Sequence, residues 1–147
     1  MLLLIFATAC ATTPAPLPAQ KPTTPRSLYD RLGGEAAIRA VVGDAIANVA
    51  ADDRIGYLFG MSDLNRTSEK LYEQICEVSG GPCHYSGRDM VSVHARLAIT
   101  DAQFDALVED IVKSLDKHQV PAAEKNELLA PFAGLRDDIV TVRQVAR

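Results

Sequence analysis

The sequence of 147 residues contains no tryptophan, and aromatic residues make up only 5% of it. Any hydrophobic core must therefore be mainly aliphatic, and a hydrophobic fraction of 48% is enough to build one domain. The sequence also lacks a long run of lysine or arginine, and its formal net charge is −4. Because nucleic-acid-binding proteins carry a basic surface, we expect no nucleic-acid partner.

The apolar run over residues 1–9 is too short to span a bilayer. It ends in small residues directly before Cys10, as export signals do. The ending Ala7-Thr8-Ala9-Cys10 resembles the lipobox of bacterial lipoproteins, in which the cysteine is lipidated and becomes the mature N-terminus. The run departs from that pattern because it is short and no Lys or Arg precedes it. A frayed hydrophobic N-terminus is the alternative.

Residues 10–27 are rich in proline, which favours extended conformations and cannot form a core. We therefore expect three segments: a lipoprotein-like signal peptide over residues 1–9, a tether over 10–27 and a folded domain over 28–143. This organisation predicts an exported protein on the periplasmic side of a bacterial membrane, anchored through a lipid on Cys10.

Apolar residues in the domain recur at helical spacing, and glycine and proline fall between these runs. The pattern predicts an all-α fold with a short helix at 28–32 ended by Gly33-Gly34, and longer helices at 35–51, about 63–78, 100–115 and 121–139. Thr100 and Gln103 form a predicted capping box. Pro121 is expected at the first helical position, and Pro131 should bend the last helix. The stripe expected on the third helix, about 63–78, is Leu64, Thr67, Leu71, Ile75 and Val78.

His94 lies among apolar residues in the segment 87–100. Imidazole is the commonest metal-binding side chain, and a histidine at the end of a short apolar helix is well placed to bind haem iron. A histidine that is simply hydrogen-bonded to a carbonyl is the alternative. His84 and His118 lie in a loop and near a helix end, and we expect both to be exposed without a functional role.

Several short motifs occur in a fixed order between residues 28 and 140. They are Leu28-Tyr-Asp-Arg-Leu-Gly-Gly34, Phe59, Gly80-Gly81-Pro82, Tyr85-Ser-Gly-Arg-Asp-Met90, His94, Leu97-Ala-Ile-Thr-Asp101 and Val120-Pro121. Their order and spacing resemble the truncated globins of group I. This resemblance implies a globin-like two-over-two helical sandwich around haem b.

The resemblance also assigns roles to individual positions. His94 matches the proximal ligand of the haem iron, Phe59 matches a phenylalanine that packs on the porphyrin, and Lys70 matches a cation directed at a haem propionate. Positions that usually form the haem wall are Tyr85, Met90, Val93, Ile99 and Phe104, and ordinary core packing is the alternative for each.

On the distal side the sequence departs from the family pattern. The Phe-Tyr pair usual in the second helix is replaced by Ala45-Ile46, and the frequent glutamine of the third helix is replaced by Leu71. Both usual hydrogen-bond donors are therefore aliphatic. Thr67 and Gln74 remain as polar candidates, although threonine often bonds to its own helix.

Cys76 and Cys83 flank the end of the third predicted helix. In an oxidising compartment such a pair stays bridged, so we expect a disulfide that also fixes the run leading to His94. Free thiols and a soft-metal site with His84 are the alternatives.

Three classes of function are compatible with these features. We expect a haem protein, not an enzyme, that reversibly binds dioxygen or another diatomic gas for transport, storage or sensing. The second class is a haem enzyme that detoxifies nitric oxide or peroxide and needs an external reductase, since the chain has no nucleotide-binding motif. The third is a haem-free helical lipoprotein that binds other proteins.

Overall fold

The computed structural model describes residues 25–142, so the expected signal peptide, Cys10 and most of the tether lie outside the described residues. The elements are α1 (Leu28–Arg31), α2 (Gly34–Ala51), the 3-10 helix η1 (Gly56–Phe59), α3 (Leu64–Val78), α4 (Met90–His94), α5 (Asp101–Lys117), α6 (Ala122–Gly134) and α7 (Arg136–Ile139). Residues 25–142 form no strand beyond an isolated bridge between Thr100 and Val142. The predicted all-α class is confirmed.

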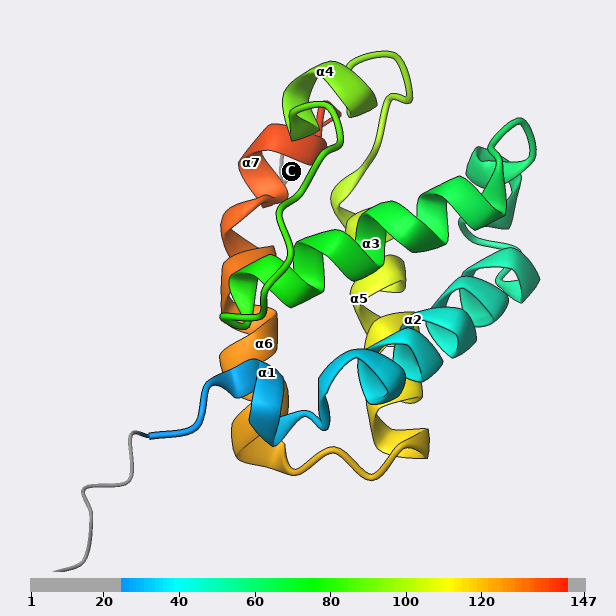
Figure 1. Ribbon diagram of the computed structural model, residues 1–147. Coiled ribbons are helices and arrows are strands. Elements are labelled where there is room, and N and C mark those ends of the chain that lie inside the picture. Colours follow the sequence, from blue (N-terminus) through cyan, green and yellow to red (C-terminus); the bar gives the residue numbers. More distant parts are fainter. Residues whose placement is uncertain (1–24, 143–147) are drawn as a thin grey trace, which may run out of the picture.

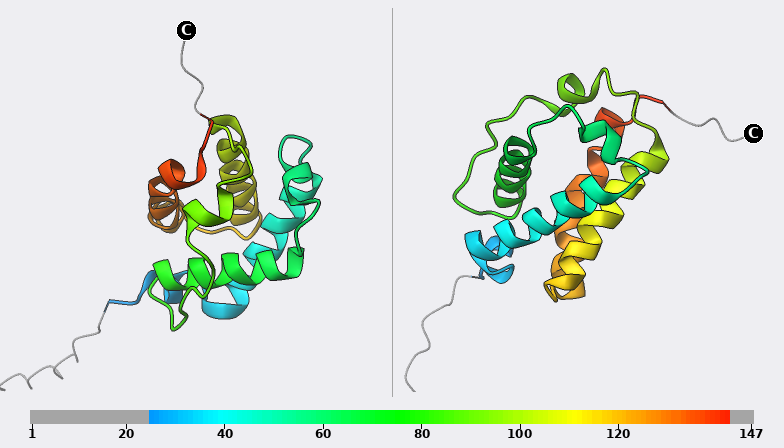
Figure 2. Two further views of the ribbon diagram at one scale, coloured as in Figure 1. Left: turned by 90° about the horizontal axis from the view of Figure 1, so that it is seen from above. Right: turned by 90° about the vertical axis from the view of Figure 1, so that its right-hand side faces the viewer.

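The long helices form two layers, with α2 and α3 in one and α5 and α6 in the other (Figures 1 and 2). α2 packs against both α3 and α5, and α3 also contacts α6. This is the expected two-over-two sandwich. The short helix α4 stands apart from these layers and packs chiefly against α7.

Most predicted helix ends agree with the structure. Gly33 takes a φ of 98° and Gly34 a φ of 71°, the left-handed values that favour glycine, although Gly34 already belongs to α2. Thr100 and Gln103 form the predicted capping box of α5. Pro121 precedes α6 as its N-cap instead of occupying its first helical position.

The predicted last helix is divided in two. Pro131 lacks the N–H that would bond to the preceding turn, and α6 ends three residues later at Gly134. Leu135 then separates α6 from α7.

The main core cluster joins α1, α2, α3, α5 and α6 and is largely aliphatic, as the composition predicted. The stripe expected on α3 is partly wrong, because Leu64 and Val78 are 37% and 40% exposed. The buried residues of this helix are instead Tyr72, Ile75 and Cys76. The helix therefore turns a face centred nearer Tyr72 toward the core.

Two polar residues of α5 are also buried. The Ser114 hydroxyl donates to the Val41 carbonyl at 2.5 Å, which joins α5 to α2. Asp110 is 1% exposed, and its Oδ1 accepts a hydrogen bond from Lys113 at 2.8 Å. Its Oδ2 has no partner among residues 25–142.

Within residues 25–142, no helix has both the length and the apolar character needed to cross a membrane.

Candidate functional site

His94 is the last residue of α4, as its position in the apolar segment predicted. The helix begins at its N-cap Asp89, whose carboxylate accepts the Ser92 N–H at 2.8 Å. His94 is half-buried, and its Nδ1 lies 2.8 Å from the Met90 carbonyl oxygen one turn earlier. Since a carbonyl can only accept, Nδ1 carries the hydrogen, and the lone pair of the neutral ring lies on Nε2. A metal-binding histidine has this same arrangement.

The residues beside His94 form part of an apolar cluster. Ile99 and Phe104 are 7% and 3% exposed and pack with Ile139 and Val140, while Met90 covers the cluster from α4. Val93 is half-buried on the same short helix. Ile99 and Phe104 are thus packed in the core, and Met90 and Val93 retain partly exposed apolar surface. The role of these four residues as a haem wall stays a prediction.

Phe59 closes η1 and packs, half-buried, against Val49, Ile55 and Ala106. The neighbouring Ile55 is 1% exposed, whereas Tyr57 is 67% exposed. The Tyr57 hydroxyl lies 2.5 Å from Gln103 Nε2 at the start of α5.

The expected distal residues lie on α2 and α3. Ile46 and Leu71 are half-buried and pack against the main core cluster. The Thr67 hydroxyl donates to the Asp63 carbonyl at 3.0 Å, so its hydrogen bonds to its own helix. The Gln74 side chain forms no hydrogen bond with residues 25–142 and is half-buried.

Lys70 does not extend freely into solvent. Its Nζ lies 2.8 and 2.9 Å from the two carboxylate oxygens of Glu73 and 2.5 Å from the Ser86 hydroxyl. The Lys70 ammonium and the backbone N–H of Ser86 lower the pKa of Glu73 to about 2. The Lys70 ammonium is therefore paired with the Glu73 carboxylate of the same helix.

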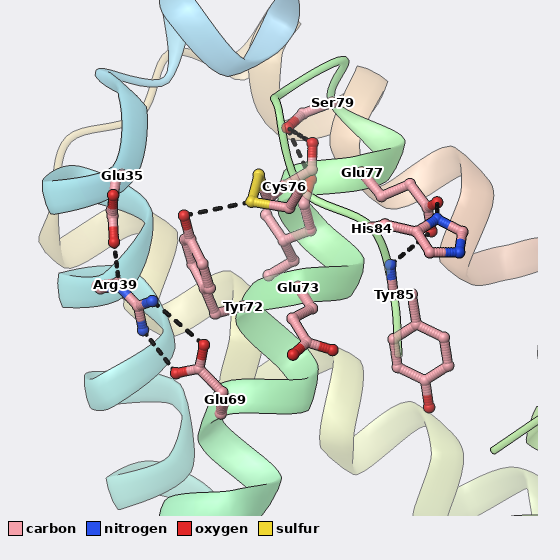
Figure 3. The surroundings of a disulfide bond; sticks show 12 residues. Glu35, Arg39, Glu69, Tyr72, Glu73, Cys76, Glu77, Ser79, His84 and Tyr85 are labelled. Carbon is pink, nitrogen blue, oxygen red and sulfur yellow. Dashed lines mark hydrogen bonds and ion pairs between the residues drawn. A yellow bond between two sulfur atoms is a disulfide. The ribbon is translucent and has the colours of Figure 1, made fainter. Parts of the chain in front are cut away.

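Tyr85 lies in the loop between α3 and α4. Its hydroxyl donates to the Arg88 carbonyl at 3.0 Å, and its ring covers Gly87 so closely that a Cβ there would clash with it. Burial raises the pKa of Tyr85. The Glu77 carboxylate accepts the Tyr85 N–H at 3.3 Å and pairs with His84 Nδ1 at 2.6 Å (Figure 3).

Cys76 and Cys83 are joined by a disulfide, with their Cα atoms 5.7 Å apart. The Tyr72 hydroxyl lies 3.3 Å from Cys83 Sγ and must be the donor, since a disulfide sulfur has no hydrogen. Residues 25–142 contain no cluster of three or more His, Cys, Asp or Glu side chains that could hold a metal ion. The soft-metal alternative with His84 is thus wrong within this range.

The other histidines lie as expected at the surface. The His84 side chain is 88% exposed. His118 pairs with Asp44 at 2.7 Å and lies in the last turn region of α5. Sequence reasoning missed Tyr72, Glu73 and Glu77; the spacing of the two glutamates, one turn apart on α3, was the available signal for a shared face.

A surface depression of about 410 Å³ lies elsewhere, on the seam between α2 and α5. It is lined by Asn48, Ala51, Asp52, Arg54, Asp110 and Lys113, which include none of the predicted site residues.

Comparisons with known proteins agree with this fold. The family model for bacterial-like globins matches residues 27–141. The group 1 truncated haemoglobin GlbN of Mycolicibacterium paratuberculosis is 32% identical over 117 residues, which cover 80% of this chain and 86% of that protein.

Solved structures are similar as well. The truncated haemoglobin of Tetrahymena pyriformis in its Fe(III) form has a TM-score of 0.75 and 29% identity, covering 78% of this chain and 98% of that one. The 2/2 haemoglobin of a Synechococcus species, in the cyanomet state with covalently attached haem, has a TM-score of 0.75 and 28% identity, covering 80% of this chain and 100% of that one. By its family match, its relatives and its fold, the chain belongs to the bacterial-like globins, as a truncated haemoglobin of group 1.

Proposed function

We propose that the protein binds haem b through His94 and reversibly binds dioxygen or another diatomic gas. The observation that carries the proposal is the contact between His94 Nδ1 and the Met90 carbonyl, because it leaves Nε2 as the metal-binding atom. Haem held by His94 would supply an iron atom able to bind a diatomic gas.

The chain supplies orientation and an apolar surrounding. Phe59, Met90 and Val93 are half-buried apolar side chains that exclude water from a porphyrin ring. Ile46 and Leu71 provide the same character on the distal side, with Thr67 bonded to its own helix. Tyr85, Ile99 and Phe104 support this surrounding from the loop and from the core near α4.

The absorption spectrum of the reduced protein with and without carbon monoxide tests the proposal. We expect a Soret band that shifts on adding carbon monoxide in the wild type, and loss of stable haem retention in His94→Ala. His118→Ala is the matched control, because that ring, at the C-cap of α5, pairs with Asp44 of α2. A His94→Ala variant that keeps the wild-type spectrum would show that another residue is the ligand.

Gas binding and gas chemistry are separated by a second measurement. We propose binding as the use of this site; turnover of nitric oxide or peroxide with a supplied reductant would instead show an enzyme. A purified full-length chain without any Soret band would favour the haem-free class.

We also propose that the protein is exported and lipid-anchored through Cys10. The support is the apolar run over residues 1–9 with its lipobox-like ending. Mass spectrometry of the N-terminal peptide from membrane fractions tests this. A mature chain that still begins at Met1 would contradict it.

A further inference from the structure

The loop after α3 runs back along that helix and is bonded to it at three positions, by a disulfide and by the carboxylates of Glu77 and Glu73. We call residues 83–86 the strap. The Cys76–Cys83 disulfide fastens its first residue. Glu77 accepts the Tyr85 N–H and pairs with His84. These two positions lie near the C-terminal end of α3 (Figure 3).

Glu73 makes the third and most extensive fastening. Its Oε2 accepts the Ser86 N–H at 2.9 Å, and both of its oxygens lie within 3.2 Å of the Ser86 hydroxyl. Lys70 binds the same carboxylate and the same hydroxyl. The Glu73 side chain is only 17% exposed, so these charge-assisted bonds are partly shielded from water.

This fastening matters because α4 has little other connection to α3. α4 packs chiefly against α7, and Figure 1 shows the segment after α3 rising across to α4. The expected distal residues Ile46 and Leu71 lie on α2 and α3, while His94 lies on α4. The strap is therefore the direct chain connection between the two sides on which a haem would be held.

We propose that Glu73 is a positioning residue for the haem ligand His94, holding the strap against α3 and so setting where α4 stands relative to the distal wall. The inference rests on the proposed function of His94. It also gives Lys70 a role within the protein, because the lysine binds both Glu73 and Ser86 and so completes their contact.

Glu73→Gln in the full-length protein tests this, with Glu69→Gln as the matched control. Glu69 lies one turn earlier on α3, but its carboxylate binds Arg39 of α2 and has no bond to the strap. Figure 3 shows Glu69 directed at Arg39. The two variants make the same chemical change on one helix, and only the first touches the strap.

Three readouts follow the effect from the strap to the ligand. Amide hydrogen exchange of residues 83–89 should rise about tenfold in Glu73→Gln, since charge-assisted hydrogen bonds are about twice as strong as neutral ones. In the haem-loaded, reduced protein, the iron–histidine stretching band should shift or broaden. Haem transfer to an excess of apomyoglobin should accelerate at least about threefold. Glu69→Gln should match the wild type in all three.

The disulfide provides an independent check of the same idea. If Glu73 and the disulfide hold one strap, Glu73→Gln should accelerate haem loss more in a Cys76→Ser/Cys83→Ser background than in the bridged protein. Equal hydrogen exchange of residues 83–89 in Glu73→Gln and Glu69→Gln would show that Glu73 does not hold the strap against α3. Faster exchange with an unchanged iron–histidine band and unchanged haem loss would overturn the link between Glu73 and His94. Hydrogen exchange does not require haem, so it tests the contact between Glu73 and the strap by itself. The proposed function of His94 is tested separately, by the spectrum of His94→Ala.

Discussion

The backbone of Gly81 lies against the ring of Tyr29, a residue of α1. A Cβ placed at Gly81 would be 2.5 Å from Tyr29 Cδ2 and 2.6 Å from Cys76 Sγ. The Tyr29 N–H also donates to the Ser79 carbonyl at 2.8 Å. Together these contacts dock α1 on the end of α3, directly before the strap begins.

Gly81→Ala should therefore destabilise the protein. The Tyr29 ring and the side chain and carbonyl of Cys76 would have to move. Overpacking of this kind costs about 1–3 kcal/mol. Urea unfolding of the purified protein measures the change. Gly43→Ala is the control: it lies inside α2 with no atom within 4 Å of an added Cβ, so it should stabilise by about 0.5–1 kcal/mol. A Gly81→Ala variant as stable as the wild type or more stable would contradict the packing at Gly81.

Glu73 makes the strap contacts depend on pH. Its pKa falls from 4.5 to about 2 in the folded protein, first because Lys70 donates to it and then because the Ser86 N–H does. A carboxyl whose pKa is lowered by folding stabilises the fold above its unfolded pKa, and the contribution is lost as the pH falls through the folded value. The Tyr85 hydroxyl, which also faces Glu73, is neutral throughout this pH range, since burial raises its pKa above the usual value of 10.

We therefore expect wild type and Glu73→Gln to differ in unfolding free energy at neutral pH and to converge between pH 4.5 and about 2. Urea unfolding at a series of pH values measures this difference. Asp52, whose pKa is also lowered to about 2 by Arg54, titrates in both proteins and cancels. A difference that is constant down to pH 2 would mean that the Glu73 charge does not stabilise the fold.

Local sequence signals predicted the elements of this fold well. Helical spacing placed the long helices, and the Thr100–Gln103 capping box located the start of α5 correctly. These features depend on residues close together in the chain, which sequence spacing describes. The group 1 globin motifs then indicated the two-over-two arrangement, which spacing alone does not determine.

Contacts between distant segments could not be predicted in the same way. Tyr72 is buried because Arg39 stacks on its ring at 3.7 Å and the strap covers its hydroxyl, and neither partner is near it in sequence. Lys70 was expected to reach a haem propionate. Its i,i+3 spacing from Glu73 allowed their ion pair, but nothing in the sequence showed that Ser86, 16 residues away, also contacts Lys70. Its role toward haem stays a prediction, as do those of the other site residues.

The disulfide should be present in protein recovered from the periplasm. Alkylation of unreduced, unfolded protein should leave Cys76 and Cys83 unmodified, and both should react after reduction. Reduction should also lower stability by an amount on the order of 2.5 kcal/mol in the chain-entropy model, since the bridged residues are 7 apart. If both cysteines react without reductant, the pair is not bridged in the exported protein.

The distal side should release dioxygen quickly. Ile46 and Leu71 cannot donate a hydrogen bond, and the Thr67 hydroxyl already donates to Asp63 at 3.0 Å. A donor directed at the polarised bound gas contributes about 1.5–3 kcal/mol, or a factor of roughly 10–100 in the dissociation rate, while nearly apolar carbon monoxide gains much less. Ile46→Tyr should therefore slow dioxygen release at least about tenfold and leave carbon monoxide affinity nearly unchanged.

Ile46→Phe separates the hydroxyl from the size of the ring. The phenylalanine fills the same space without a donor, so it should not slow dioxygen release as tyrosine does. Stopped-flow dissociation rates for dioxygen and carbon monoxide in the wild type and both variants measure the effect. Gln74 is the remaining polar side chain on α3 without a hydrogen bond to residues 25–142, and a wild type that already releases dioxygen slowly would point to a donor such as this one. Equal slowing by tyrosine and phenylalanine would mean that the ring blocks the exit of the gas and that no hydrogen bond is involved.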